Sequence, residues 1–124
     1  MAVPIIILWG CAGAFALFGV LFLARPEAMA KTVELQAPTP TAHTEIRAMY
    51  GGLELGIAAF LGYCALDPSR VALGLLASAL LLGGIGTGRL IGVALARSAS
   101  SLTRVLVVAE ISGAALAAWS YTTL

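Results

Sequence analysis

The chain has 124 residues, of which 60% are hydrophobic and only 10% are charged, and its mean hydropathy is +1.01. A soluble domain has roughly 45–50% apolar and roughly 25% charged residues, so this composition indicates an integral membrane protein. The formal net charge is +1 and no basic block is present, which excludes nucleic acids and acidic macromolecules as expected partners.

Apolar segments take up most of the chain and are separated by short polar breaks. The predicted membrane spans are residues 3–24, 45–66, 71–96 and 102–121. Each is long enough, at about 1.5 Å per residue, to cross a hydrocarbon core of about 30 Å. Prolines, serines and Asp67 lie in the breaks, where helices end. We therefore predict an all-α protein, a compact antiparallel bundle of four transmembrane helices that forms a single domain over residues 1–124.

The longest connection, residues 25–44, is predicted to be a cytoplasmic loop. Arg25-Pro26-Glu27 has the pattern of a helix start, and Met29, Val33 and Leu35 would place a short helix on the bilayer surface. The first span has no basic region before it, and its apolar run is too long for a secretory signal. We therefore expect it to be retained in the membrane.

Basic residues are distributed unequally between the two ends of this bundle. The end that holds the loops 25–44 and 97–101 carries Arg25, Lys31, Arg47, Arg97 and Arg104, whereas the opposite end carries only Arg70. Cytoplasmic loops are enriched in lysine and arginine. The pattern therefore predicts that both termini lie on the non-cytoplasmic side of the membrane.

One arginine lies inside a span, in the glycine-rich stretch "GGIGTGRLIG" (83–92). Counted from the basic end, Arg89 lies about 12 Å deep, Glu54 about 13 Å and Glu110 about 9 Å. Charges at such depths are costly, so they face the interior of a bundle and pair with one another. Arg89 is therefore predicted to form a buried ion pair with Glu110, Glu54 or both.

A further polar pattern begins the second span, in "EIRAMYGGLELG" (45–56). At helical spacing Arg47, Tyr50 and Glu54 share one face, which leads from the basic end to the buried layer. One interpretation is a ligand-binding or buried polar cluster of Arg47, Tyr50, Glu54, Arg89 and Glu110. In the other interpretation Arg47 reaches the lipid headgroups, Tyr50 belongs to the interfacial aromatic belt, and the remaining charges form a structural ion-pair network.

Glycines recur at small-xxx-small spacing, which lets helix backbones approach closely in lipid. This spacing predicts helix-packing positions at Gly51, Gly52, Gly56, Gly84, Gly88 and Gly92. A dinucleotide-binding loop is not expected, because no strand precedes the glycine run and the run lies inside a span.

No pattern for catalysis or for a cofactor emerges from the remaining residues. Cys11 and Cys64 form no C-x-x-C motif and are interpreted as small buried side chains. His43 has no spaced metal-ligating partner and is interpreted as a solvated loop residue. We therefore predict no catalytic residue, no metal site and no cofactor.

Three motifs together resemble a known family: "EIRAMYGGLELG" (45–56), "GRLIG" (88–92) and "VVAEISG" around Glu110. They resemble a bacterial four-helix membrane family of unknown function in the DoxX-like superfamily, over essentially the whole chain. The resemblance implies a four-helix fold in the bacterial inner membrane. Relatives in that superfamily include membrane subunits associated with sulfur and quinone redox chemistry, which implies a role near quinones or another lipophilic ligand. The matching residues are Arg47, Tyr50, Gly51, Gly52, Glu54, Gly88, Arg89 and Glu110.

Three functions are compatible with these features. The favoured one is the binding of a small amphipathic or lipophilic molecule, quinone-like or lipid-like, or of a membrane partner, at the polar cluster. The alternatives are a proton-coupled small-solute transporter that uses Glu54 or Glu110, and a membrane enzyme acting on a lipid-soluble substrate. The absence of a cofactor ligand set or paired cysteines argues against an enzyme. The expected partners are the lipid bilayer, a small lipophilic ligand, and a second copy of the chain or a larger membrane complex.

Overall fold

The computed structural model describes all of residues 1–124 and contains helices but no strand, which confirms the all-α class. The longer α-helices are α1 (Ala2–Ala24), α4 (Leu53–Ala65), α5 (Val71–Ala96) and α6 (Ser101–Thr122). The shorter elements are α2 (Pro26–Thr32), α3 (Pro40–Ile46), the π-helical turn η1 (Arg47–Gly52) and the 3₁₀ turn η2 (Pro68–Arg70).

The second long helix begins earlier than the sequence indicates. α3, η1 and α4 follow one another without a break, so a single helical stretch runs from Pro40 to Ala65. Thr39 has an extended backbone and its side chain accepts a hydrogen bond of 3.1 Å from the Ala42 backbone N–H. A threonine at the N-cap and a proline at the first helical position are both favourable, so the helix starts inside the expected loop.

Four helical stretches are long and apolar enough to cross a membrane. They are Ala2–Ala24, Pro40–Ala65, Pro68–Ala96 and Ser101–Thr122. Only 23 of the 124 residues are buried inside the monomer, and many large apolar side chains lie on the outside of these helices. An apolar exterior of this kind suits lipid rather than water, which supports the assignment to membrane proteins.

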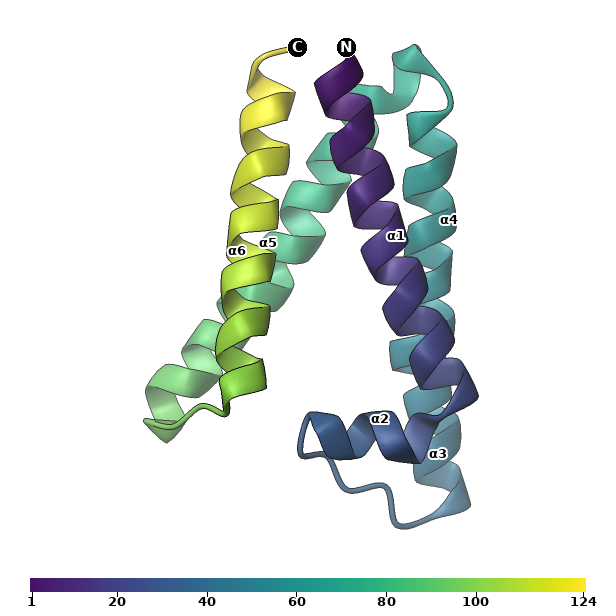
Figure 1. The fold of residues 1–124 in the computed structure, drawn as a ribbon, viewed down its shortest axis with the longest axis vertical. Coiled ribbons are helices and arrows are strands. Elements are labelled where there is room, and N and C mark those ends of the chain that lie inside the picture. Colours follow the sequence, from purple (N-terminus) through teal and green to yellow (C-terminus); the bar gives the residue numbers. More distant parts are fainter.

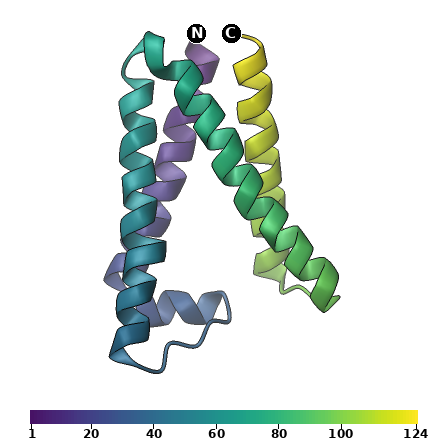
Figure 2. The ribbon, with the colours of Figure 1, turned by 180° about the vertical axis from the view of Figure 1, so that it is seen from behind.

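The long helices form two pairs that meet at one end and diverge toward the other (Figures 1 and 2). α1 packs mainly against α4, and α5 packs mainly against α6. Both chain termini lie at the end where the pairs meet, while α2 and α3 lie at the opposite end, beside the α1–α4 pair. The main core lies where the pairs meet and includes the fully buried Leu8, Leu61, Val71, Leu75 and Ala117.

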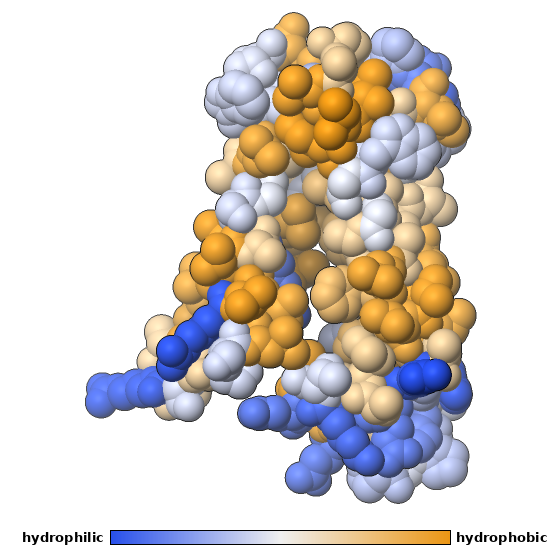
Figure 3. Space-filling model, viewed as in Figure 1, coloured by the Kyte–Doolittle hydropathy of each residue, from blue (hydrophilic) through white to orange (hydrophobic).

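The expectation of a compact bundle was therefore wrong in one respect, because the bundle is open at the end that carries α2. Short connections require neighbouring helices to be antiparallel, but they do not require the two pairs to stay in contact along their whole length. Figure 3 shows the molecule hollowed between the two pairs at this end, where hydrophilic residues also gather.

A smaller core fixes the short helices at the open end. Phe22, Ala30 and Ile46 are buried together, and Met29 and Val33 pack against them. The helix expected after Arg25 is present as α2, but Met29 and Val33 point into the protein rather than onto the bilayer surface. Leu35 is exposed, as the sequence indicates.

Candidate functional site

An ion pair between α5 and α6 is the centre of the candidate site. The Nε atom of Arg89 donates hydrogen bonds to both carboxylate oxygens of Glu110, at 2.9 and 3.0 Å. Gly86 lies one turn before Arg89, and a Cβ atom there would lie 2.7 Å from Ile111 Cδ1 and 3.2 Å from Glu110 Cβ. A glycine at this position therefore lets the two helices approach closely enough for the ion pair to form.

The ion pair is only partly buried, which corrects the prediction of a buried pair. The side chain of Arg89 is 32% exposed and that of Glu110 is 12% exposed. At this end of the molecule the α1–α4 pair has diverged from α5 and α6, and Arg89 makes no hydrogen bond or ion pair with it. Arg89 makes no further hydrogen bond in the protein, and its two terminal nitrogens are left without a partner.

Glu54 belongs to the same layer but to the other helix pair. It lies on α4, is half-buried, and makes neither a hydrogen bond nor an ion pair. Its carboxylate is near enough to interact electrostatically with both Glu110 and Arg89. Three ionisable groups from three helices therefore share one region, with direct contact only between Arg89 and Glu110.

Arg47 and Tyr50 have their partners on α1 and make no hydrogen bond or ion pair with Glu54, Arg89 or Glu110. The Nε atom of Arg47 donates a hydrogen bond of 3.1 Å to the carbonyl of Leu23, near the end of α1, and the ring of Tyr50 stacks on Phe22 with centroids 5.2 Å apart. The physical reason is η1. A π-helical turn has more residues per turn than an α-helix, so the α-helical spacing that aligned Arg47 with Tyr50 and Glu54 does not apply across it.

Most of the predicted helix-packing glycines do not pack against a neighbour. A Cβ atom at Gly56, Gly84, Gly88 or Gly92 would meet nothing within 4 Å, and one at Gly52 would meet only the Arg47 carbonyl at 3.8 Å. Gly51 is the exception, because a Cβ there would lie 3.1 Å from the backbone nitrogen of Leu23. On α5 the contact is made by Gly86, and two residues correspond to about 200° of rotation, so Gly88 lies on the opposite side.

A pocket of about 370 Å³ adjoins Arg89 at the open end. Its walls come from the last turns of α5, from the connection to α6 and from the first turn of α6, and Glu34 contributes from the loop after α2. The lining residues are Glu34, Arg89, Gly92, Val93, Ala96, Ser98, Ala99, Ser100 and Thr103. Glu34 has φ of 59°, a left-handed backbone conformation that is uncommon for residues other than glycine.

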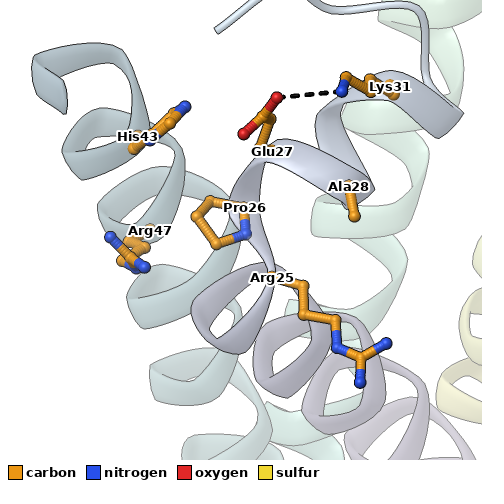
Figure 4. A pocket seen from close by; sticks show the side chains of 7 residues that line it. All are labelled: Arg25, Pro26, Glu27, Ala28, Lys31, His43 and Arg47. Atoms are coloured by element: carbon orange, nitrogen blue, oxygen red, sulfur yellow. Dashed lines mark ion pairs between the residues drawn. The ribbon is translucent and has the colours of Figure 1, made fainter. Parts of the chain in front are cut away.

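A second pocket, of about 470 Å³, lies at the junction of α1, α2 and α3 (Figure 4). It is lined by Arg25, Pro26, Glu27, Ala28, Lys31, His43 and Arg47, and we call it the basic pocket. Lys31 Nζ lies 2.9 Å from Glu27 Oε1, and this contact holds the pKa of Glu27 below its usual range.

The basic pocket was not predicted from the sequence. His43 was predicted to be a solvated loop residue, whereas its Nε2 atom lies 2.8 Å from the Ala37 carbonyl oxygen. The available signal was the spacing of Arg25, Lys31 and Arg47 around one loop. That signal was used only to predict orientation in the membrane.

Comparison with known proteins identifies a family. The family described as "Domain of unknown function (DUF4345)" matches residues 5–121, and the chain belongs to this family. The match covers most of the chain and gives no support for the DoxX-like superfamily. No curated protein and no solved structure matches the chain.

Proposed function

We propose that this protein binds a small amphipathic molecule between its two helix pairs, with the polar head of that molecule at Arg89. The proposal depends on the incomplete hydrogen bonding of the Arg89 guanidinium group. Glu110 holds it through Nε alone, its terminal nitrogens have no partner, and it lines a pocket of about 370 Å³. Ligand sites for small molecules commonly measure about 300–1,000 Å³.

The charges around Arg89 favour a neutral head group. Glu110 already neutralises the guanidinium, and Glu54 adds a second carboxyl group nearby. A further anion would therefore meet no excess of positive charge. A carbonyl or hydroxyl oxygen, as in a quinone or a neutral lipid, accepts hydrogen bonds from the free guanidinium nitrogens without adding charge.

The apolar part of the ligand would lie along α5. Gly92, Val93 and Ala96 supply a wall of small side chains beside Arg89, which suits a flat ring or an acyl chain. The motifs that resemble the DoxX-like superfamily favour a quinone-like head group. We also propose that the open end faces the cytoplasm in a bacterial inner membrane, because most basic residues lie in or next to the two connections at this end.

The experiment is calorimetric titration of the purified protein, in a neutral detergent, with a decyl-substituted benzoquinone and with a monoacylglycerol. Arg89→Gln should weaken binding about tenfold to a hundredfold, because a hydrogen bond from a charged donor contributes about 1.5–3 kcal/mol. Arg104→Gln is the matched control, since Arg104 is an exposed arginine at the same end that does not line the pocket. Equal affinity of Arg89→Gln and the unmodified protein for both probes would contradict the proposal.

Glu54 favours proton-coupled transport as a second candidate function. It is a half-buried carboxylate without an ion-pair partner, inside a stretch that is able to span a membrane. Intramembrane carboxylates of this kind commonly carry protons in transporters. In proteoliposomes, a pH gradient should drive proton flux through the unmodified protein, and Glu54→Gln should abolish that flux. Flux that survives in Glu54→Gln would exclude this role of Glu54.

A further inference from the structure

The basic pocket carries an excess of positive charge that the protein does not neutralise. Arg25, Lys31 and Arg47 contribute three cations, and Glu27 is the only carboxylate in the lining. With His43 neutral, the charge of the lining is 3 − 1 = +2. Its residues do not overlap with those of the pocket at Arg89, so the inference below is independent of the proposed function.

We propose that the basic pocket binds the phosphate group of an anionic phospholipid at the membrane surface. Guanidinium and ammonium groups are the usual partners of phosphate oxygens, and guanidinium groups bind them in a two-point geometry. The open end of the molecule therefore carries a lipid-headgroup site in addition to the pocket at Arg89.

The cations in the pocket have donors available for such a ligand. The side chain of Arg25 forms no hydrogen bond or ion pair, and Arg47 uses only its Nε atom, on the Leu23 carbonyl. Lys31 is paired with Glu27, but both side chains are exposed, and an exposed pair of this kind contributes little stability. Lys31 can therefore exchange its partner for a phosphate at low cost.

The position of the pocket selects a lipid rather than a soluble anion. It lies where the chain leaves α1 at Ala24 and turns into α2. α1 is long and apolar enough to span a membrane, and the end of such a helix is where lipid headgroups meet a protein. Leu21 and Leu23, in the last turn of α1, are exposed. They offer an apolar surface for acyl chains directly beside the cations, which a free phosphate ion would not use.

The test is thermal unfolding of the full chain in a neutral detergent with increasing dioctanoyl phosphatidic acid. Dioctanoyl phosphatidylcholine and inorganic phosphate form the comparison arms. A ligand that binds the folded state raises the melting temperature as its concentration exceeds its dissociation constant. We expect phosphatidic acid to raise it, inorganic phosphate to do so only at much higher concentration, and phosphatidylcholine to have no effect.

Two variants and a matched control locate the site. Arg25→Gln and Lys31→Gln should each weaken the binding of phosphatidic acid about fivefold, the factor expected for one basic residue near an anionic headgroup. Both side chains are exposed, so the variants should fold, and circular dichroism checks this. Arg104→Gln removes an exposed arginine at the same end outside the pocket and should leave the binding unchanged.

Distinct outcomes would overturn the inference. An equal loss of binding in Arg104→Gln would show general surface attraction instead of a site. Equal stabilisation by phosphatidylcholine, or by inorganic phosphate at the same concentration, would exclude an anionic lipid as the ligand. Arg89→Gln should retain phosphatidic acid binding, so a failure at this pocket is distinguishable from a failure of the proposed function.

Discussion

Arg89 has a structural contact with Glu110 and, in the proposed function, also a binding role. Its Nε atom is held by Glu110 while its terminal nitrogens stay free, so the same side chain joins α5 to α6 and offers donors to a ligand. Glu110 is the more buried partner, with 12% of its side chain exposed. Removal of Arg89 would therefore leave a carboxylate in a mostly apolar environment without its counter-charge.

A double-mutant cycle on this pair measures its structural role. Arg89→Ala should destabilise the protein by about 1–3 kcal/mol, between the values for exposed and for fully buried pairs, because the largely buried Glu110 loses its partner. Glu110→Gln in addition should restore part of that loss. The measurement is thermal unfolding of both single variants and the double variant at one pH in one detergent.

The control is the same cycle with Glu54→Gln, which should show a smaller coupling because Glu54 does not touch Arg89. Additive effects in the Glu110 cycle would contradict the ion pair as an energetic unit. A double variant that keeps full stability but loses quinone binding would assign the pair a functional role as well.

At the scale of the elements, α5 has a packed face and an open face, each with its own glycines. Gly86 is buried against α6, while Gly84, Gly88 and Gly92 are exposed on the other side. Sequence spacing identified the regular series of glycines, but that series lies on the open face. The contact with α6 depends on a single glycine that belongs to no such series.

This difference predicts opposite outcomes for two neighbouring glycines. Gly86→Leu should lower the melting temperature, because overpacking a close contact costs about 1–3 kcal/mol and its Cβ would already overlap Ile111. Gly88→Leu places the same side chain on the open face and should leave the melting temperature nearly unchanged. Thermal unfolding in detergent compares the two variants directly. A clear loss in Gly88→Leu would mean that the open face is in contact with a second copy of the chain.

The two ends of the molecule differ in structure and in charge. The termini and the main core are at one end, and α2, α3, both pockets and most of the basic residues are at the other. Both proposed ligands would therefore enter from the same side of the membrane. The opening between the helix pairs has the same orientation, since the pairs diverge toward the basic end.

Cysteine labelling in intact cells tests this orientation. In a background without Cys11 and Cys64, single cysteines at Thr39 and Ser100 should be shielded from an impermeant thiol reagent, because both lie at the basic end, which we propose to be cytoplasmic. A cysteine at Ser69 lies at the opposite end and should react. After membrane permeabilisation, all three should react. The reverse pattern in intact cells would invert the orientation.

The sequence by itself determined the helical membrane class and the depth of the charged residues. Both follow from composition and from the rise per residue along a helix. Apolar length alone indicates an all-α membrane protein, because an uncharged stretch longer than the hydrocarbon core has few alternatives. The rise per residue places Arg89, Glu54 and Glu110 at similar depths, and a charge at such depth needs a partner. The pairing of Arg89 with Glu110 was thus one of the combinations predicted.

Only the tertiary structure decided how the helices are rotated and how far apart they lie. The π-helical turn at Arg47–Gly52 changes the facing of Arg47, whose side chain bonds to the Leu23 carbonyl, and local periodicity does not reveal such a turn. Gly86 rather than Gly88 faces α6, and the helix pairs diverge, so the ion pair stays partly exposed and both pockets lie at the open end. Rotation and separation depend on the side-chain packing between elements distant in the chain, which helical spacing within one segment does not contain.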